Sequence, residues 1–482
     1  MGVTVPELDA PQRSRSSARL LTLLFITAAL AGAIMAHMPG LDGPWYSHWG
    51  WRRTPAALVY PAMIGAAIPL FAALWLHEWR HINGRILLPL VMLSHALFQL
   101  IAISLLDSQS FSFDVYIKSV VHPDALSYFA DAASLVGGSG NARDWLTNYP
   151  DLLPHMFLHS QTKPAGPVMF FAAFISALGL ERSTALISGL CVAGISTLIA
   201  PAVYFLCRAL RLPASASFYA SAWVVLTPSA VMFLPSLDAW YMLSTCTFLG
   251  CWIHALRENR FVWSISFGAA LMLTGFFVYN ILVIGAAVVA YAMFCAEIPP
   301  GRRAVRFVRH AGVVLLVVVA LYAMLHLLTG YNPIATFLSA YRIQESMPDE
   351  FNRAYRWTIL FDQTDFALGA GWLAMLLTGM FLFRRRNGGD EAVAALCRCF
   401  AWIVVGQIAL TGFSGLLPGE NARVWAFLVP LLMPMVGGEL SQWSRRARLI
   451  AFAAAWLLLA LLIQNLLEQD VERMPLVRLY PL

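Results

Sequence analysis

Long apolar segments follow one another along almost the whole chain, and this pattern restricts the possible folds more than any other feature. A helix needs about 20 mostly apolar residues to cross the hydrocarbon core of a bilayer. Charged residues make up only 12% of the chain, against about 25% in a soluble globular domain. We therefore expect an all-α, polytopic integral membrane protein in which residues 1–482 form a single membrane domain.

Thirteen segments are predicted to be transmembrane helices from their length and apolarity. They cover residues 20–37, 55–76, 86–106, 186–206, 215–234, 238–256, 261–279, 281–297, 311–329, 367–383, 396–416, 424–440 and 449–467. The apolar segment 166–180 is excluded because it is short for a span. It is predicted to be an interfacial or re-entrant helix at the membrane surface.

Arginine-rich connections set the predicted orientation of these spans. They are RSRSSAR, HEWRHINGR, CRALR, RENR, GRRAVRFVRH, FRRR and SRRAR. With thirteen spans all of them fall on one side, which the positive-inside rule assigns to the cytoplasm. The N-terminus is then cytoplasmic, and two long loops, residues 107–166 and 330–366, are external. If segment 166–180 crossed the membrane, every later basic connection would face outward.

Neither nucleic acid nor a disulfide framework is expected. The formal net charge of +6 comes from short arginine clusters between apolar segments, so no nucleic-acid partner is predicted. The seven cysteines lie in apolar segments or beside basic connections, outside the long loops, which argues against a disulfide framework. They are Cys191, Cys207, Cys246, Cys251, Cys295, Cys397 and Cys399.

The first external loop contains the stretch HPDALSYFADA. Pro123 suits the first turn of a helix, and Asp124 beside it would meet the positive end of the helix dipole. Tyr128 and Asp131 follow Asp124 by four and seven residues, which places all three on one side of such a helix. The stripe predicts a polar site at the external membrane surface. The structural alternative is a helix-start residue on an ordinary amphipathic interfacial helix.

The same loop ends in HSQTKPAGPVMFF, which contains His159 and Lys163. Lys163 is one of only two lysines in the chain, and the other, Lys118, lies in the same loop. A lysine just before Pro-Ala-Gly-Pro, where the chain returns to the interface, suits a fixed cation that faces a phosphate. The alternative is a lysine that anchors the loop by extending its ammonium group to the membrane surface.

Ionisable residues also stand at the external start of two later spans, where lipid disfavours them. Asp238 begins one span in LPSLDAWYML, and Glu420 and Arg423 begin another in LPGENARVWAFLVP. Under the predicted topology they share the external side with the first loop. The structural alternatives are a helix cap for Asp238 and a local ion pair between Glu420 and Arg423.

Four short motifs occur in order along the chain: DALSYFADA, TKPAGPVMFF, SLDAWYMLSTCTFLG and ARVWAFLVPLL. Together they resemble the GT-C glycosyltransferases, most closely the branch with aminoarabinose transferase and the protein O-mannosyltransferases. The resemblance implies a GT-C-like fold with external juxtamembrane helices, in a bacterial inner membrane with the active site facing outward, towards the periplasm. It implies transfer of a sugar from a polyprenyl-phosphate carrier to a lipid, glycan or protein acceptor, and leaves any divalent cation and its ligands unassigned.

The resemblance also implies roles for individual residues. Asp124 matches the catalytic acid of the first external loop, Lys163 a phosphate-contacting position and Arg423 a late cation near the carrier phosphate. A carboxylate suits the removal of the acceptor's proton, and cations suit the charge that grows on the departing phosphate. A single displacement inverts the anomeric centre, whereas retention would need a second nucleophile such as Asp131. The predicted substrate-binding residues are Tyr128, Asp131, His159, Lys163, Asp238, Glu420 and Arg423.

Two other functions remain open. The stretch HEWRH at residues 77–81 has the spacing of a zinc-binding H-E-x-x-H motif, as in intramembrane metalloproteases. Against that reading, the motif lies among arginines on the cytoplasmic side, and no later Asp-Gly ligand pattern follows because Asp238 precedes Ala239. A transporter or flippase of lipid-linked sugar would predict polar residues near mid-span. Here the ionisable residues gather at one face.

Overall fold

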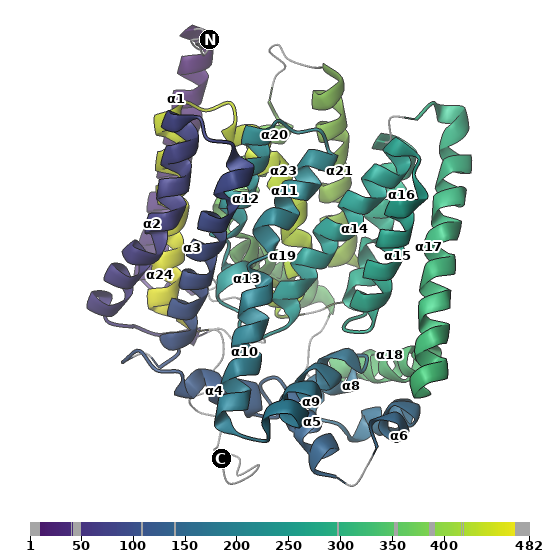
Figure 1. Cartoon of the computed structure of the whole chain (residues 1–482). Coiled ribbons are helices and arrows are strands. Elements are labelled where there is room, and N and C mark those ends of the chain that lie inside the picture. Colours follow the sequence, from purple (N-terminus) through teal and green to yellow (C-terminus); the bar gives the residue numbers. More distant parts are fainter. Residues whose placement is uncertain are drawn as a thin grey trace.

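A computed structural model describes residues 10–39, 41, 50–107, 109–138, 141–295, 298–350, 355–384, 391–415, 417 and 419–467. These residues are almost entirely helical, which confirms the all-α prediction for the described part of the chain (Figure 1). Two short strands, β1 (Gly50–Trp51) and β2 (Leu466–Leu467), pair antiparallel.

The helices up to residue 231 are α1 (Ala10–Met35), α2 (Ala56–Arg80), α3 (Gly84–Ser104), α4 (Asp114–Val121), α5 (Tyr128–Gly137), α6 (Ala142–Thr147), α7 (Tyr149–Leu152), η1 (Leu153–His155), α8 (Leu158–Gln161), α9 (Gly166–Leu178), α10 (Arg182–Ser196), α11 (Ile199–Ala209), α12 (Ala214–Val224) and α13 (Pro228–Val231). The later helices are α14 (Asp238–Glu258), α15 (Phe261–Gly275), η2 (Asn280–Ile284), α16 (Gly285–Ala290), η3 (Tyr291–Cys295), α17 (Pro300–Thr329), α18 (Pro333–Glu350), α19 (Tyr355–Ala370), α20 (Trp372–Leu382), α21 (Glu391–Ser414), α22 (Asn421–Val424), η4 (Ala426–Leu428), α23 (Val429–Leu440) and α24 (Arg445–Asn465).

Seven helices among the described residues are long and apolar enough to cross a membrane. They are Ser17–Met35, Ala56–Arg80, Gly84–Ser104, Arg182–Ala209, Pro300–Thr329, Val393–Ser414 and Arg445–Asn465. The pair α19 and α20 would make an eighth span, but it is bent by 97°. These helices indicate a membrane protein, while the predicted number of thirteen spans is not confirmed.

Several predicted spans are short helices in the protein interior. Every residue of α23 is buried, and α12 packs against it. Pro430 and Pro434 lie within α23, and a 3₁₀ turn precedes it, so the apolar stretch is divided into short pieces. An apolar run in a sequence is expected for a helix buried inside the protein as well as for a helix that faces lipid. That ambiguity explains why apolarity overestimates the number of spans.

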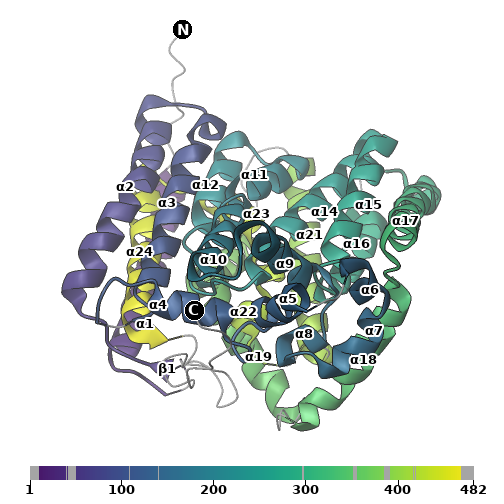
Figure 2. The same ribbon diagram turned by 60° about the horizontal axis from the view of Figure 1, so that its bottom comes forward.

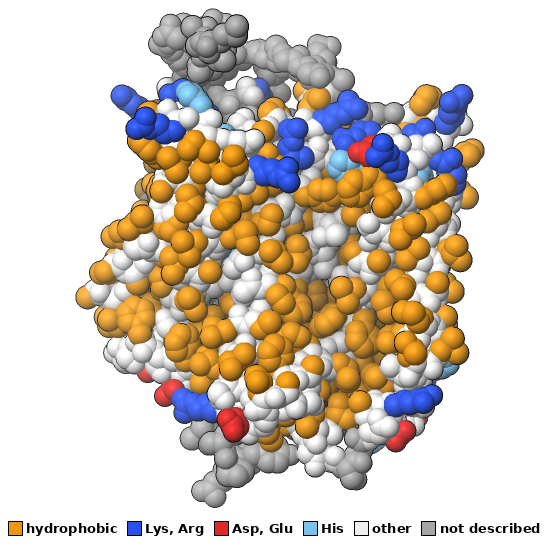
Figure 3. All heavy atoms as spheres, in the orientation of Figure 1, with side chains coloured by type: hydrophobic (Ala, Val, Ile, Leu, Met, Phe, Trp, Pro, Cys, Tyr) orange, Lys and Arg blue, Asp and Glu red, His pale blue; other side chains and the backbone are white. Residues whose placement is uncertain are grey.

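One end of the helical bundle carries the basic connections. Arg257 donates a hydrogen bond to the carbonyl oxygen of Ala209 at 2.8 Å, and Arg306 donates one to that of Leu256 at 2.8 Å. The connections around α11, α14 and α17 therefore meet. We call this end, with Arg80, Arg208, Arg257, Arg302 and Arg445, the basic end, and Figure 3 shows the arginines along it at the top. Arg385 and Arg386 of the predicted FRRR connection lie outside the described residues.

The opposite end carries α4 to α9 and α18, and we call it the loop end (Figures 1 and 2). Both predicted external loops contribute to it. Helix α9, within the predicted interfacial segment 166–180, is shorter than the helices that count as spans and lies with these helices. The predicted helix start at Pro123 is wrong, because α4 ends at Val121 and α5 begins only at Tyr128.

The cysteine prediction needs one correction. Cys295, the last residue of η3, forms a disulfide with Cys399 of α21. The two residues are 104 positions apart in sequence, and both lie in segments that read as ordinary apolar spans. Sequence spacing alone could not show that these two helices lie side by side.

Candidate functional site

Three charged residues from two distant segments form the centre of a mostly buried polar site at the loop end. The Nε atom of Arg423 lies 3.5 Å from Oδ2 of Asp238, which begins α14. Arg423 also forms a short ion pair with Glu420, just before α22. The three side chains are only 10 to 15% exposed. The predicted local ion pair therefore exists, but it is part of a tertiary contact that also includes Asp238.

His159 of α8 and Lys163 lie within electrostatic range of this centre. Burial and the neighbouring Arg423 lower the pKa of His159 to about 4, so its imidazole is neutral at pH 7. Burial also lowers the pKa of Lys163, whereas the carboxylates of Asp238 and Glu420 act to raise it. Both side chains are half-buried, which leaves them within reach of a ligand.

Tyr128 and Asp131 complete the site from α5. Burial, helped by Asp238, raises the pKa of the buried Tyr128 hydroxyl, while Arg423 opposes this shift. Burial raises the pKa of Asp131 to about 6, and the Phe157 N–H group, which donates a hydrogen bond to its carboxylate at 3.4 Å, acts to lower it. Tyr128 thus lies within electrostatic range of both the Asp131 carboxyl and the charged centre. We call the seven residues Tyr128, Asp131, His159, Lys163, Asp238, Glu420 and Arg423 the polar cluster.

A tight turn before α5 holds the first loop against α8. Ser127 has a left-handed backbone conformation with φ of 66°. Its hydroxyl donates a hydrogen bond to the Pro123 carbonyl at 2.5 Å and accepts one from the His159 N–H group at 3.0 Å. Farther along, the Tyr149 hydroxyl donates to the carbonyl oxygen of Lys163 at 3.0 Å. The backbone on which His159 and Lys163 stand is therefore fixed from two sides.

Two buried carboxylates of α19 position the segment that carries Arg423. Asp362 accepts a hydrogen bond from the Gly419 N–H group at 3.2 Å, and Asp365 accepts one from Ala422 at 3.1 Å. The Ser229 hydroxyl donates to the Ala422 carbonyl oxygen at 2.6 Å. Sequence reasoning missed both aspartates. The available signal was a pair of acids inside the apolar stretch LFDQTDFALGA.

Asp124, the predicted catalytic acid, does not point into the polar cluster. Its side chain is 69% exposed, and its carboxylate lies 3.8 Å from Nδ1 of His122. The predicted helical face shared by Asp124, Tyr128 and Asp131 is wrong because α5 begins after Asp124. The structure therefore brings together seven of the eight predicted site residues and leaves Asp124 at the surface.

The HEWRH stretch has a structural explanation at the basic end. Glu78 is buried and forms a two-pronged ion pair with Arg448, at 2.5 and 2.6 Å, and it accepts a hydrogen bond from Tyr219 at 2.7 Å. His77 bonds through Nδ1 to the Ile82 carbonyl oxygen at 2.9 Å. His81 lies beyond the end of α2. Within the described ranges, no group of three or more His, Cys, Asp or Glu side chains is placed to hold a metal ion.

Comparison with known proteins gives no family for this chain. No protein-family model matches the sequence, and no curated protein matches it. The fold and site of the described residues define an almost entirely helical protein with membrane-length helices and a mostly buried polar cluster at one end. Any function must be argued from that geometry.

Proposed function

We propose that the protein is a GT-C-like membrane glycosyltransferase that moves a sugar from a polyprenyl-phosphate carrier to an acceptor hydroxyl. The observation that carries the proposal is the polar cluster itself. Cations, carboxylates and a neutral imidazole from α5, α8, the segment before α9, α14 and the start of α22 lie close together at the loop end. They include Lys163 and Arg423, to which the resemblance gives a role at the carrier phosphate. In this proposal the loop end faces the periplasm of a bacterium, and the N-terminus faces the cytoplasm.

Lys163 and Arg423 bind the carrier phosphate in this proposal. Glu420 accepts a charge-assisted hydrogen bond from Arg423, and Asp238 adds an ion pair at 3.5 Å, so the two carboxylates hold the guanidinium in one orientation. Lys163, which belongs to the first predicted external loop, supplies a second, compact cation. When the bond between the anomeric carbon and the phosphate oxygen breaks, negative charge grows on the leaving phosphate. Fixed cations in a mostly buried site stabilise that charge more than water would.

Asp131 accepts the proton of the acceptor hydroxyl in this proposal. The acceptor oxygen forms a bond to the anomeric carbon while the phosphate departs, and the hydroxyl proton passes to the carboxylate. A pKa of about 6 keeps Asp131 ionised at pH 7 and close to the working pH, which favours general-base catalysis. This single displacement inverts the anomeric configuration. Asp124, exposed beside the site, is the competing candidate from the sequence resemblance.

Release of the carrier tests the proposal. Purified protein in lipid nanodiscs is incubated with polyprenyl-phosphate sugars radiolabelled in the carrier, and candidate lipid, glycan and peptide acceptors are added in turn. We expect free polyprenyl phosphate to appear with one sugar and acceptor pair. A protein that binds the lipid-linked sugars and moves them across a sealed vesicle without releasing the carrier would instead be a flippase, and the proposal would fail.

A further inference from the structure

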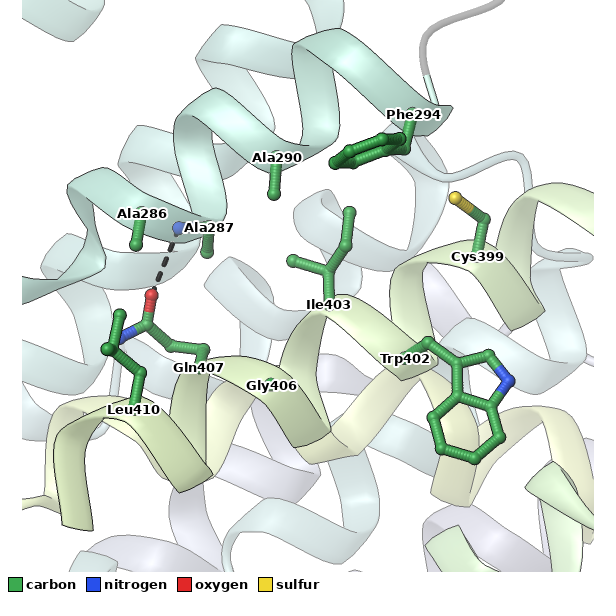
Figure 4. Close-up of a pocket in the computed structure, with 10 residues that line it drawn as sticks. All are labelled: Ala286, Ala287, Ala290, Phe294, Cys399, Trp402, Ile403, Gly406, Gln407 and Leu410. Atoms are coloured by element: carbon green, nitrogen blue, oxygen red, sulfur yellow. Dashed lines mark hydrogen bonds between the residues drawn. The ribbon is translucent and has the colours of Figure 1, made fainter. Parts of the chain in front are cut away.

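A groove lies on the side of the bundle between the segment 280–295 and α21 (Figure 4). Its volume is about 510 Å³. The lining residues are Ala286, Ala287, Ala290, Phe294, Cys399, Trp402, Ile403, Gly406, Gln407 and Leu410. The groove belongs to different helices from the polar cluster, so the inference below does not depend on the proposed glycosyl transfer.

The side chains that line the groove are mostly apolar. Gln407 accepts a hydrogen bond from the Ala287 N–H group at 3.0 Å, and its amide donates to the Thr411 hydroxyl at 3.2 Å. Figure 4 shows the first of these bonds across the groove. The sulfur of Cys399 is taken up by the disulfide with Cys295. Because the Gln407 amide is hydrogen-bonded within the protein and the other lining side chains are mostly hydrocarbon, the groove suits an apolar chain.

The groove runs along α21, whose residues Val393–Ser414 are long and apolar enough to cross a membrane. Phe294 and Trp402 at one end are 70 and 57% exposed, and Leu410 at the other end is 52% exposed. The lining residues of α21 run from Cys399 to Leu410, a rise of about 16 Å along the helix. That length is roughly half the thickness of a bilayer core. One leaflet's acyl chain therefore matches the groove in length.

Arginines stand at the Phe294 end of the groove. Arg303 at the start of α17 donates hydrogen bonds to the carbonyl oxygens of Met293, at 2.7 Å, and Ile298, at 2.9 Å. This anchoring holds its guanidinium next to Phe294, and Arg302 beside it is exposed. Cations at the interface favour anionic headgroups.

We propose that this groove binds one acyl chain of an anionic phospholipid from the leaflet at the basic end, with the phosphate beside Arg302 and Arg303. The position of the charge distinguishes this occupant from the tail of a polyprenyl-phosphate donor. A donor must place its phosphate at Lys163 and Arg423, at the loop end, whereas the cations of this groove lie at the basic end.

The test compares substitutions at two glycines that both have free space around an added Cβ. A Cβ added at Gly406 or at Gly312 of α17 meets no atom within 4 Å, so a side chain can start at either position without a clash at its first carbon. Gly406→Leu fills the groove, and Gly312→Leu does not. Each protein is purified from nanodiscs with equal phosphatidylglycerol and phosphatidylcholine, and the retained lipid is counted by native mass spectrometry.

We expect the wild type and Gly312→Leu to retain phosphatidylglycerol in preference to phosphatidylcholine, and Gly406→Leu to retain it at least about fivefold less. A double variant, Arg302→Gln with Arg303→Gln, should lose the preference between the two lipids while still retaining lipid. Equal retention by Gly406→Leu and Gly312→Leu would overturn the proposal. So would displacement of the bound phosphatidylglycerol by equimolar polyprenyl phosphate, because the groove would then hold the tail of that lipid.

Discussion

Arg423 is the residue on which the charged contacts of the site converge. It pairs with Glu420 within its own turn and with Asp238 across the fold, and it influences the pKa values of His159 and Lys163. Because Glu420 and Asp238 fix its guanidinium, a ligand phosphate meets an oriented cation instead of a mobile one. This arrangement is the physical basis for assigning a phosphate to the site.

Asp131 and Asp124 are the two candidates for the general base, and substitutions of each distinguish them. Asp131→Asn should reduce turnover by about 10² to 10⁴ if Asp131 is the base, because the amide cannot take the proton. Asp124→Asn should leave turnover within about twofold. Turnover of the wild type should rise with pH through about 6, as the Asp131 carboxyl ionises. Carrier-release rates of the three proteins between pH 5 and 8 check these outcomes, and the opposite ranking of the two variants would restore Asp124 as the base.

Asp131 should also make stability depend on pH. Its pKa in the folded protein is about 6, against about 3.9 for an unfolded aspartate. Between these values the native state binds more protons, so stability falls as pH rises, by at most about 3 kcal/mol. Asp131→Asn should therefore raise the thermal midpoint at pH 7 and have little effect at pH 4. If Asp131→Asn were destabilised equally at pH 7 and pH 4, the ionised Asp131 carboxylate would not destabilise the folded protein.

The two lysines give a matched pair for the proposed phosphate contact. Lys163→Ala should weaken donor binding about 10- to 100-fold, since hydrogen bonds to charged groups contribute about 1.5 to 3 kcal/mol. Lys118→Ala in α4 should leave the donor dissociation constant unchanged. Titration of each protein with a lipid-linked sugar measures both effects. If the two variants bound the donor equally well, Lys163 would be a membrane anchor only.

Sequence reasoning singled out seven residues that the fold brings close together, but it misplaced Asp124. Charged residues at the starts of apolar segments are conspicuous, and that signal was sufficient for Asp238, Glu420 and Arg423. The helical spacing from Asp124 assumed a start at Pro123, whereas Ser127 turns the chain with a positive φ. Serine rarely adopts that conformation, and no local rule forecasts it. Its cause is tertiary, because its hydroxyl links Pro123 to His159.

At the scale of elements, α19 shows what an apolar pattern conceals. The sequence predicts an external loop up to residue 366 and a span from residue 367, yet α19 is one helix that bends by 97° into α20 and turns two aspartates towards α22. Burial of those carboxylates is possible because backbone N–H groups satisfy them. Only the fold reveals such partners, since Asp365 and Ala422 are far apart in sequence.

Asp365→Ala should destabilise the protein by about 1 to 3 kcal/mol, because the Ala422 N–H group loses a buried acceptor. Asp365→Asn keeps an acceptor oxygen and should recover part of that loss. Asp151→Ala, at an exposed position, serves as the control. Thermal unfolding in detergent gives the stabilities, and a donor titration should show weaker binding for Asp365→Ala than for the control. Unchanged binding would mean that α19 does not position Arg423.

Glu78 at the end of α2 should behave as a structural residue. Removing one partner of a buried ion pair costs about 3 to 5 kcal/mol, since the other charge remains buried. Glu78→Ala should therefore unfold at lower temperature, while the zinc content of the protein stays the same. His77→Ala combined with His81→Ala should also leave bound zinc unchanged. Loss of stoichiometric zinc from this double variant in a folded protein would support the metalloprotease hypothesis.

In the whole molecule, the arginine-rich surface and the surface around the polar cluster lie at opposite ends. Arginines gather at the basic end, and the short helices around the polar cluster gather at the loop end (Figures 1 and 3). The sequence predicted this division through its basic connections. It could not predict which segments meet, because the pairing of α8 with α22, or of Cys295 with Cys399, depends on packing between residues far apart in the chain.

The central claim is that the polar cluster transfers sugar at the face opposite the basic end. Sealed vesicles of uniform orientation test it, with the basic end inside and the carrier-labelled lipid in the membrane. A membrane-impermeant acceptor found by the carrier-release screen is supplied on one side at a time. We predict release of polyprenyl phosphate only when the acceptor is outside, and none with Lys163→Ala at donor concentrations near the wild-type dissociation constant. Release that depended on acceptor at the basic end, or that persisted fully in Lys163→Ala, would contradict the account.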